Sequence, residues 1–128
     1  MRLLLDTHVL VWWLTDSPSL PESVRPLIAS RETTVFVSAA SCWEIAIKVR
    51  SGKWSEAAGL VPGMADVLAR AKLTPLAVTV SHAERAGLLG TDHKDPFDRL
   101  LAAQALEENL VLASVDPAFH RIDGLTVV

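Results

Sequence analysis

The sequence predicts an α/β protein in which a mainly parallel sheet of four to five strands is covered by helices on both faces. Short apolar runs alternate with longer segments of helical spacing along the whole chain. Strands separated by helices are joined by crossover connections, which make neighbouring strands parallel. The run Leu3-Leu4-Leu5 is continuously apolar, as in strands buried on both faces. With 128 residues, half of them hydrophobic, we expect one domain over residues 1–128.

The first half of the chain predicts two strands and three helices. Residues 33–37 are β-branched and aromatic, which favours a strand. A helix is expected to begin at Ser38 and to end at Ser51-Gly52. The expected strands are residues 3–5 and 33–37, and the expected helices are residues 7–14, 20–29 and 38–50.

The second half begins with an irregular segment, residues 51–63, and then continues the alternation. An apolar stripe at helical spacing predicts a helix over residues 60–71. Ser81 is suited to cap a short helix that Gly90 ends. The further expected elements are strands over residues 76–80, 111–114 and 125–128 and a long helix over residues 95–108.

Composition restricts the classes of function. The formal net charge of −3 gives no overall basic surface for nucleic acid, so any such contact must be local. The single cysteine, Cys42, cannot form an internal disulfide, which fits a reducing compartment. No uninterrupted apolar stretch of about 18 residues predicts a membrane span, and no signal peptide is evident. We therefore expect a cytoplasmic protein.

Asp6 follows the first strand directly and is the first candidate for a functional site. Groups at the carboxyl ends of strands in open α/β sheets commonly form binding sites. A carboxylate at such an edge is costly to desolvate unless it is paired, and a bound metal ion is one such partner. The alternative is that Asp6 caps the following helix. The two roles are compatible, because a capping carboxylate keeps one oxygen free.

Glu44 and three later acids are the other candidates. Glu44 lies on a largely apolar helix, where the alternative is a surface ion pair with Lys48. Asp95 and Asp98 fit the cap and third positions of the long helix, and Asp116 also precedes a proline as a cap or turn residue. Capping does not exclude metal binding, since the positive end of a helix favours the ionised carboxylates that a hard cation requires.

Four segments together resemble a PIN-domain ribonuclease and, within that family, the VapC-type toxins of type II toxin–antitoxin systems. They are LLDTHVL at residues 4–10, SAASCWEI at 38–45, DPFDRLLAAQA at 95–105 and SVDPAF at 114–119. The resemblance implies a three-layer α/β/α sandwich, a carboxylate site for Mg²⁺ or Mn²⁺, and endonucleolytic cleavage of RNA. Asp6, Glu44, Asp98 and Asp116 match the four acids of the family, and Asp95 is an additional acid beside them.

On this basis Asp6, Asp98 and Asp116 are expected to hold one or two cations, with Glu44 ligating or orienting the attacking water. The resemblance also makes Thr7 and Ser114 hydrogen-bond donors near the metal. Lys94 and Arg99, which flank the acids of the long helix, are the expected RNA contacts. We expect His8 to lie in the core or to be hydrogen-bonded, and Trp54 to be an exposed contact. The other three tryptophans, Trp12, Trp13 and Trp43, are expected in the core.

The resemblance further implies a cognate antitoxin protein and a homodimer. The helices predicted over residues 20–29 and 60–71 are apolar enough to form a groove for an antitoxin helix. Two alternatives remain. One is a non-catalytic PIN-like module that binds RNA or Mg²⁺ for regulation. The other is a small-molecule phosphohydrolase, although His8 stands where a haloacid-dehalogenase-type site needs a second acid.

Overall fold

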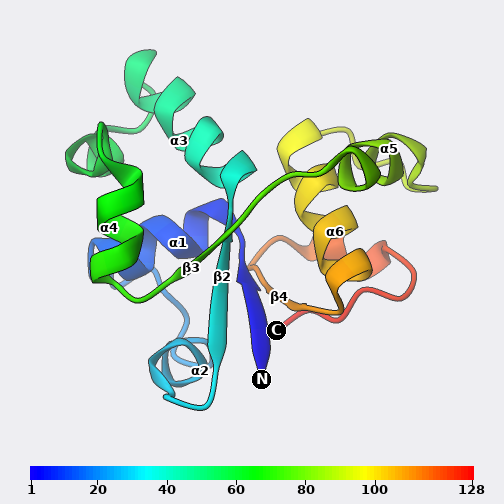
Figure 1. Ribbon diagram of the computed structural model, residues 1–128, viewed down its shortest axis with the longest axis horizontal. Helices are drawn as coiled ribbons and strands as arrows, with labels where there is room; N and C mark the ends of the chain where they lie inside the picture. Colours follow the sequence, from blue (N-terminus) through cyan, green and yellow to red (C-terminus); the bar gives the residue numbers. More distant parts are fainter.

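A four-stranded, all-parallel sheet forms the centre of the computed structural model, which describes residues 1–128. The strands are β1 (Arg2–Leu5), β2 (Thr34–Ser38), β3 (Thr74–Leu76) and β4 (Val111–Ala113), in the spatial order β3-β2-β1-β4 (Figure 1). In the register of the sheet, Leu3 of β1 lies between Val35 of β2 and Val111 of β4. The predicted parallel α/β architecture is thereby confirmed.

Six α-helices and two short 3₁₀-helices connect and cover the strands. They are α1 (Thr7–Leu14), α2 (Arg25–Ala29), α3 (Ala39–Arg50), α4 (Met64–Arg70), α5 (Val80–Leu88) and α6 (Pro96–Glu108), with η1 (Ser55–Leu60) and η2 (Pro117–Arg121). None of the helices combines the length and the hydropathy needed to cross a bilayer.

The two faces of the sheet bury different parts of the core. Leu3 and Leu5 of β1 pack in a cluster with side chains of α1, α2, α3 and α4, whereas Leu4 packs with side chains of α6 and η2. Successive strand residues point to opposite faces, so the unbroken apolar run of β1 serves both layers at once. Each of these fully buried leucines contributes roughly 1.5–3 kcal/mol of hydrophobic stabilisation. The result is a three-layer sandwich, with α5 packed outside α6 (Figure 1).

Three predicted elements begin or end elsewhere. The helix expected over residues 60–71 is shorter, as α4, because Pro62 and the left-handed Gly63 separate it from η1. The helix expected over residues 20–29 is reduced to α2, because Pro26 lacks an amide hydrogen and its ring obstructs a helix running through it from Leu20. The strand expected over residues 76–80 lies earlier, as β3. Pro75 is tolerated there because β3 is an edge strand.

The prediction that Ser81 caps the helix after β3 was wrong. Thr79, not Ser81, is the cap of α5: its hydroxyl accepts from the amide of His82, and the His82 ring accepts from the amide of Thr79. The expected strand over residues 125–128 is likewise absent. Val127 makes only an isolated parallel bridge to Leu112, so the sheet has four strands.

Candidate active site

A cavity of about 330 Å³ opens where β1 and β4 end, and all five acids singled out in the sequence line it. The carboxyl ends of parallel strands meet at one edge of a sheet, which brings together side chains far apart in the sequence. The lining residues are Asp6, His8, Trp12, Glu44, Lys48, Asp95, Asp98, Val115 and Asp116.

Asp6 is fixed at the bottom of this site by three hydrogen bonds. Its backbone amide donates to the carbonyl of Ala113 at 2.9 Å, which continues the β1–β4 pairing beyond the strand ends. Its Oδ1 accepts from the amide of Thr7 at 2.7 Å, and its Oδ2 accepts from the hydroxyl of Ser114 at 2.7 Å. Burial raises the pKa of Asp6, and these two side-chain contacts oppose the rise. Asp6 is therefore both the cap of α1 and a wall of the cavity.

Glu44 projects from α3 and is buried, with 4% of its surface exposed. Its Oε2 pairs with the Lys48 ammonium at 2.7 Å, while its Oε1 is buried without any hydrogen-bond partner. The ion pair with Lys48 is present, but it lies at the cavity and not on an open surface. An unpaired buried oxygen costs roughly 1–3 kcal/mol, so its persistence favours an additional positive partner in the functional protein.

Asp95 and Asp98 begin α6. Oδ1 of Asp95 caps the helix by accepting from the amides of Phe97 and Asp98, at 2.9 and 3.1 Å. Asp98 lies one turn in, and its Oδ2 is 2.8 Å from Nε2 of His93. Burial raises the pKa of Asp98 to about 6; the nearby charges of Asp6 and Asp95 add to the rise, and the His93 hydrogen bond opposes it.

Asp116 completes the group from the loop after β4. Its Oδ1 caps η2 through the amide of Ala118 at 2.9 Å, and its own amide donates to the Ser114 hydroxyl at 3.1 Å. Ser114 therefore joins Asp116 to Asp6. Ligand atoms of His93, Asp98 and Asp116 all lie within 4.8 Å of one another.

These residues fit a hard divalent cation. Carboxylate oxygens dominate the donor set, which suits Mg²⁺ or Mn²⁺ better than a thiolate-binding metal. Two features favour a positive charge here: the unpartnered Oε1 of Glu44, and the charge of Asp6, which helps to raise the pKa of Asp98. Five acids line the cavity and could hold such an ion: Asp6, Glu44, Asp95, Asp98 and Asp116. Among them, Asp98 and Asp116 have ligand atoms close to one another and to His93.

The sequence over residues 3–125 matches the family model of the PIN domain. The chain belongs to the PIN-domain family. PIN domains are generally nucleases, and the acidic cavity is consistent with that class. No curated protein sequence matches the chain.

Three solved structures share the fold of this PIN domain. A chain of VapBC2 from Rickettsia felis, bound to a promoter DNA fragment, has a TM-score of 0.72 and 21% identity, covering 100% of this chain and 98% of that one. A chain of DNA-bound VapBC from Salmonella typhimurium has a TM-score of 0.69 and 18% identity, with coverage of 100% and 97%. A chain of FitAcB from Neisseria gonorrhoeae has a TM-score of 0.63 and 20% identity, with coverage of 98% and 95%.

The four predicted substrate-binding residues differ in burial and in their hydrogen-bond partners in the PIN domain. Thr7 is buried and its hydroxyl donates to Ser41 at 2.9 Å, and Ser114 orients Asp6. The five guanidinium N–H groups of Arg99 bond to the carbonyls of Ala86, Gly87, Leu89, Thr91 and His93. Arg99 therefore tethers the loop before α6 and is outside the cavity lining. Lys94 is exposed beside the acids and has no side-chain partner.

Several rings lie where the sequence did not indicate. His8 is exposed and lines the cavity instead of packing in the core. Trp54 is only 8% exposed, whereas Trp43 is 61% exposed, the reverse of the expectation. His93 was not recognised as a site residue. The available signal was its position five residues before Asp98, in a loop that α6 and Arg99 hold in place.

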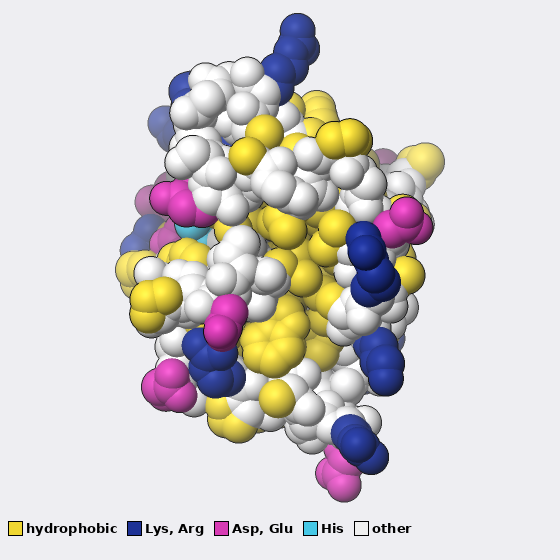
Figure 2. Space-filling model, turned by 90° about the vertical axis from the view of Figure 1, so that its left-hand side faces the viewer, with side chains coloured by type: hydrophobic (Ala, Val, Ile, Leu, Met, Phe, Trp, Pro, Cys, Tyr) yellow, Lys and Arg dark blue, Asp and Glu magenta, His cyan; other side chains and the backbone are white.

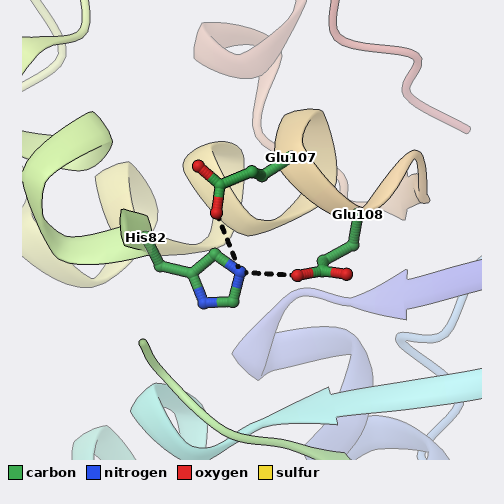
Figure 3. A group of neighbouring side chains, drawn as sticks. All are labelled: His82, Glu107 and Glu108. Carbon is green, nitrogen blue, oxygen red and sulfur yellow. Dashed lines mark hydrogen bonds and ion pairs between the residues drawn. The ribbon is translucent and has the colours of Figure 1, made fainter. Parts of the chain in front are cut away.

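A second cluster of titratable groups, His82 with Glu107 and Glu108, lies between α5 and α6 (Figure 3). Nδ1 of His82 accepts from the amide of Thr79, so the proton is on Nε2, which donates to Glu108 at 2.9 Å. Glu107 lies 3.4 Å from the same nitrogen. Neither ring nitrogen has a lone pair free for a metal, and the cluster instead fastens α5 to α6.

Proposed function

We propose that this PIN domain is a Mg²⁺- or Mn²⁺-dependent endoribonuclease and the toxin of a toxin–antitoxin pair. The observation that carries the proposal is the convergence of Asp6, Glu44, Asp98 and Asp116 on one cavity, with a buried oxygen of Glu44 left unpartnered. Asp95 contributes a fifth carboxylate at the rim. Family membership and the toxin–antitoxin complexes among the similar structures support the same conclusion.

The residues of the chain divide the work of phosphodiester hydrolysis. A bound cation would lower the pKa of the attacking water and neutralise the charge that develops on the phosphate. Asp6, Asp98 and Asp116 hold it, and Ser114 keeps Asp6 in position through its 2.7 Å hydrogen bond. Glu44 orients the attacking water and accepts its proton through its free Oε1. His93 orients Asp98 through the 2.8 Å contact between its Nε2 and Oδ2 of Asp98.

The same charges explain why metal must precede RNA. Five carboxylates around one cavity repel a phosphate, and Lys48 is the only cation among the lining residues. Divalent metal reverses that balance. Lys94, exposed next to Asp95, then adds a local attraction for the RNA backbone that the net charge of −3 does not provide.

An antitoxin partner is supported by a second surface. A hollow of about 630 Å³ lies on the face that carries α2 and α4, and Figure 2 shows hydrophobic side chains gathered in a hollow there, with Lys and Arg side chains beside it. It is lined by Trp13, Ile28, Ala29, Ser30, Arg31, Thr33, Val35, Ala71, Lys72 and Leu73. We propose that an amphipathic antitoxin helix packs here. The exposed Trp43 and Ile47 of α3 supply an apolar patch for the proposed homodimer.

The proposed activity is tested by incubating the purified protein with a mixed pool of structured RNAs in Mg²⁺, in Mn²⁺ and in chelator. Cleavage with either metal, its loss in chelator, and its loss in Asp6→Asn and Asp98→Asn are expected. Asp92→Asn is the matched control, because Asp92 is an exposed acid in the loop before α6 and does not line the cavity.

Two results would contradict the proposal. Full activity of a well-folded Asp6→Asn protein would remove the acidic cavity from the mechanism. RNA binding without cutting in every condition would favour the non-catalytic PIN-like module. Hydrolysis of small phosphate esters with no action on RNA would instead favour the phosphohydrolase.

A further inference from the structure

A second hollow, of about 410 Å³, adjoins the acidic cavity and is not explained by metal binding. Trp12 lines both spaces, so they are neighbours beside α1. The residues that line the second hollow are Val11, Trp12, Thr15, Asp16, Ser17, Pro18, Ser19, Trp54 and Glu56.

The boundary between the two spaces is built from aromatic rings. The exposed His8 ring lies 4.8 Å from the ring of Trp54 and 5.8 Å from that of Trp12, both tilted. The Lys48 ammonium stands 5.3 Å from the centre of the Trp54 ring while it pairs with Glu44. An aromatic cluster of His8, Trp12 and Trp54 therefore lies directly beside the carboxylates.

The walls of the hollow favour a nucleobase over a phosphate. No Lys or Arg is among the lining residues, and the nearby Arg25 is already engaged with Asp16 and with the carbonyl of Ser17. The carboxylates of Asp16 and Glu56 repel a phosphate but accept hydrogen bonds from the amino and imino groups of a base. The exposed ring of His8 and the partly exposed ring of Trp12 supply a stacking surface that every base can use. Trp54, only 8% exposed, packs against His8.

We propose that the aromatic cluster and the hollow behind it bind one unpaired base of the RNA, next to the phosphate that is cleaved. This inference rests on the proposed nuclease function and adds a base-binding subsite to it. A base within a helix is stacked on both faces, so it must leave the stack to reach this subsite.

The test uses ligands that cannot be cleaved. The four nucleoside 5′-monophosphates are titrated in Mg²⁺ against ribose 5-phosphate, which lacks the base, and the four indole N–H resonances are followed by NMR. The indoles of Trp12 and Trp54 are expected to shift, while those of Trp13 and Trp43 stay in place. At least one nucleotide is expected to bind roughly tenfold more tightly than ribose 5-phosphate.

Two variants and a control sharpen the result. His8→Ala removes an exposed ring and is expected to weaken nucleotide binding roughly tenfold while leaving ribose 5-phosphate binding unchanged. Glu56→Gln is expected to change the order of preference among the four bases. His120→Ala, which removes an exposed histidine outside both spaces, is expected to behave like the wild type.

Equal affinity for ribose 5-phosphate and all four nucleotides would overturn the base subsite, as would shifts confined to Trp13 or Trp43. Unchanged nucleotide binding in His8→Ala would also overturn it, and would leave the hollow to another occupant such as an antitoxin segment. These results are independent of RNA cleavage. A protein that binds nucleotides as expected but cuts no RNA would contradict the proposed function alone.

Discussion

Asp98 makes the stability of the protein depend on pH in a specific direction. The pKa of Asp98 is raised from 3.8 to about 6 in the folded state, mainly by burial. The folded protein therefore holds more protons than the unfolded chain between about pH 4 and pH 6, and its stability falls as pH rises through that range. At about 1.4 kcal/mol per pKa unit the loss is at most about 3 kcal/mol, and solvent screening of the partly exposed carboxyl makes it smaller.

We predict that Asp98→Asn abolishes this part of the pH dependence. In chelator, the variant should be more stable than the wild type at pH 7, and the difference should vanish near pH 4. Urea unfolding of both proteins between pH 4 and pH 7.5 measures it, with Asp92→Asn as the control. Parallel stability curves for wild type and Asp98→Asn would show that Asp98 is not desolvated in this way.

The pair formed by Glu44 and Lys48 gives a second prediction. Exposed helical pairs contribute about 0.3–0.5 kcal/mol, but Glu44 is buried and its second oxygen is unpartnered. Lys48→Met should therefore destabilise the metal-free protein by about 1–3 kcal/mol, less than a fully buried pair because Lys48 is one-third exposed.

A double-mutant cycle with Glu44→Gln isolates the pairwise contribution, measured by urea unfolding in chelator. We expect a coupling energy above about 1 kcal/mol between the two positions. Mg²⁺ should restore part of the stability lost in Lys48→Met by taking the place of the ammonium beside Glu44. A coupling energy near zero would make the pair an ordinary surface contact.

At the scale of elements, Arg99 connects α6 to the end of α5 and the loop that follows. All five of its N–H groups bond to backbone carbonyls of residues 86–93. This loop includes His93, which in turn contacts Asp98. Arg99 therefore acts on the site by fixing the loop, not by meeting RNA.

We predict that Arg99→Lys destabilises the protein by about 2 kcal/mol or more, because an ammonium cannot reach five carbonyls and hydrogen bonds to charged groups are each worth about 1.5–3 kcal/mol. Hydrogen exchange should accelerate most in residues 86–93. Arg85→Ala, on the exposed side of α5, is the control. Exchange that rises uniformly across the chain would contradict a local tethering role.

Helices with clear capping and proline signals were predicted accurately from the sequence. Proline and capping signals identified α1, α3 and α6 well, since Asp6, Ser38 and Asp95 are caps in the structure. The ends of α2 and β3 were not predicted correctly, because in each case an apolar pattern continues past a local signal. That signal is Pro26 for α2 and the Thr79–His82 capping box after β3. Periodicity alone does not reveal such competition.

At the scale of the molecule, the parallel sheet explains why acids so far apart in the sequence were recognisable as one group. Asp6 and Asp116 follow strands that end at the same edge, and their convergence follows from topology once the strands are assigned. The aromatic cluster could not be predicted in this way. Its rings come from α1 and from the irregular segment at Trp54, whose path depends on tertiary packing.

The central claim is that the acidic cavity binds a divalent cation and that RNA cleavage depends on that ion. Its most direct test is a Mn²⁺ titration of the wild type and of Asp98→Asn, in which bound Mn²⁺ is counted by electron paramagnetic resonance and cleavage is measured in the same samples. We predict that cleavage saturates with binding in the wild type and that both are lost in the variant. Mn²⁺ binding of equal strength in Asp98→Asn, or cleavage that proceeds without bound Mn²⁺, would contradict the account.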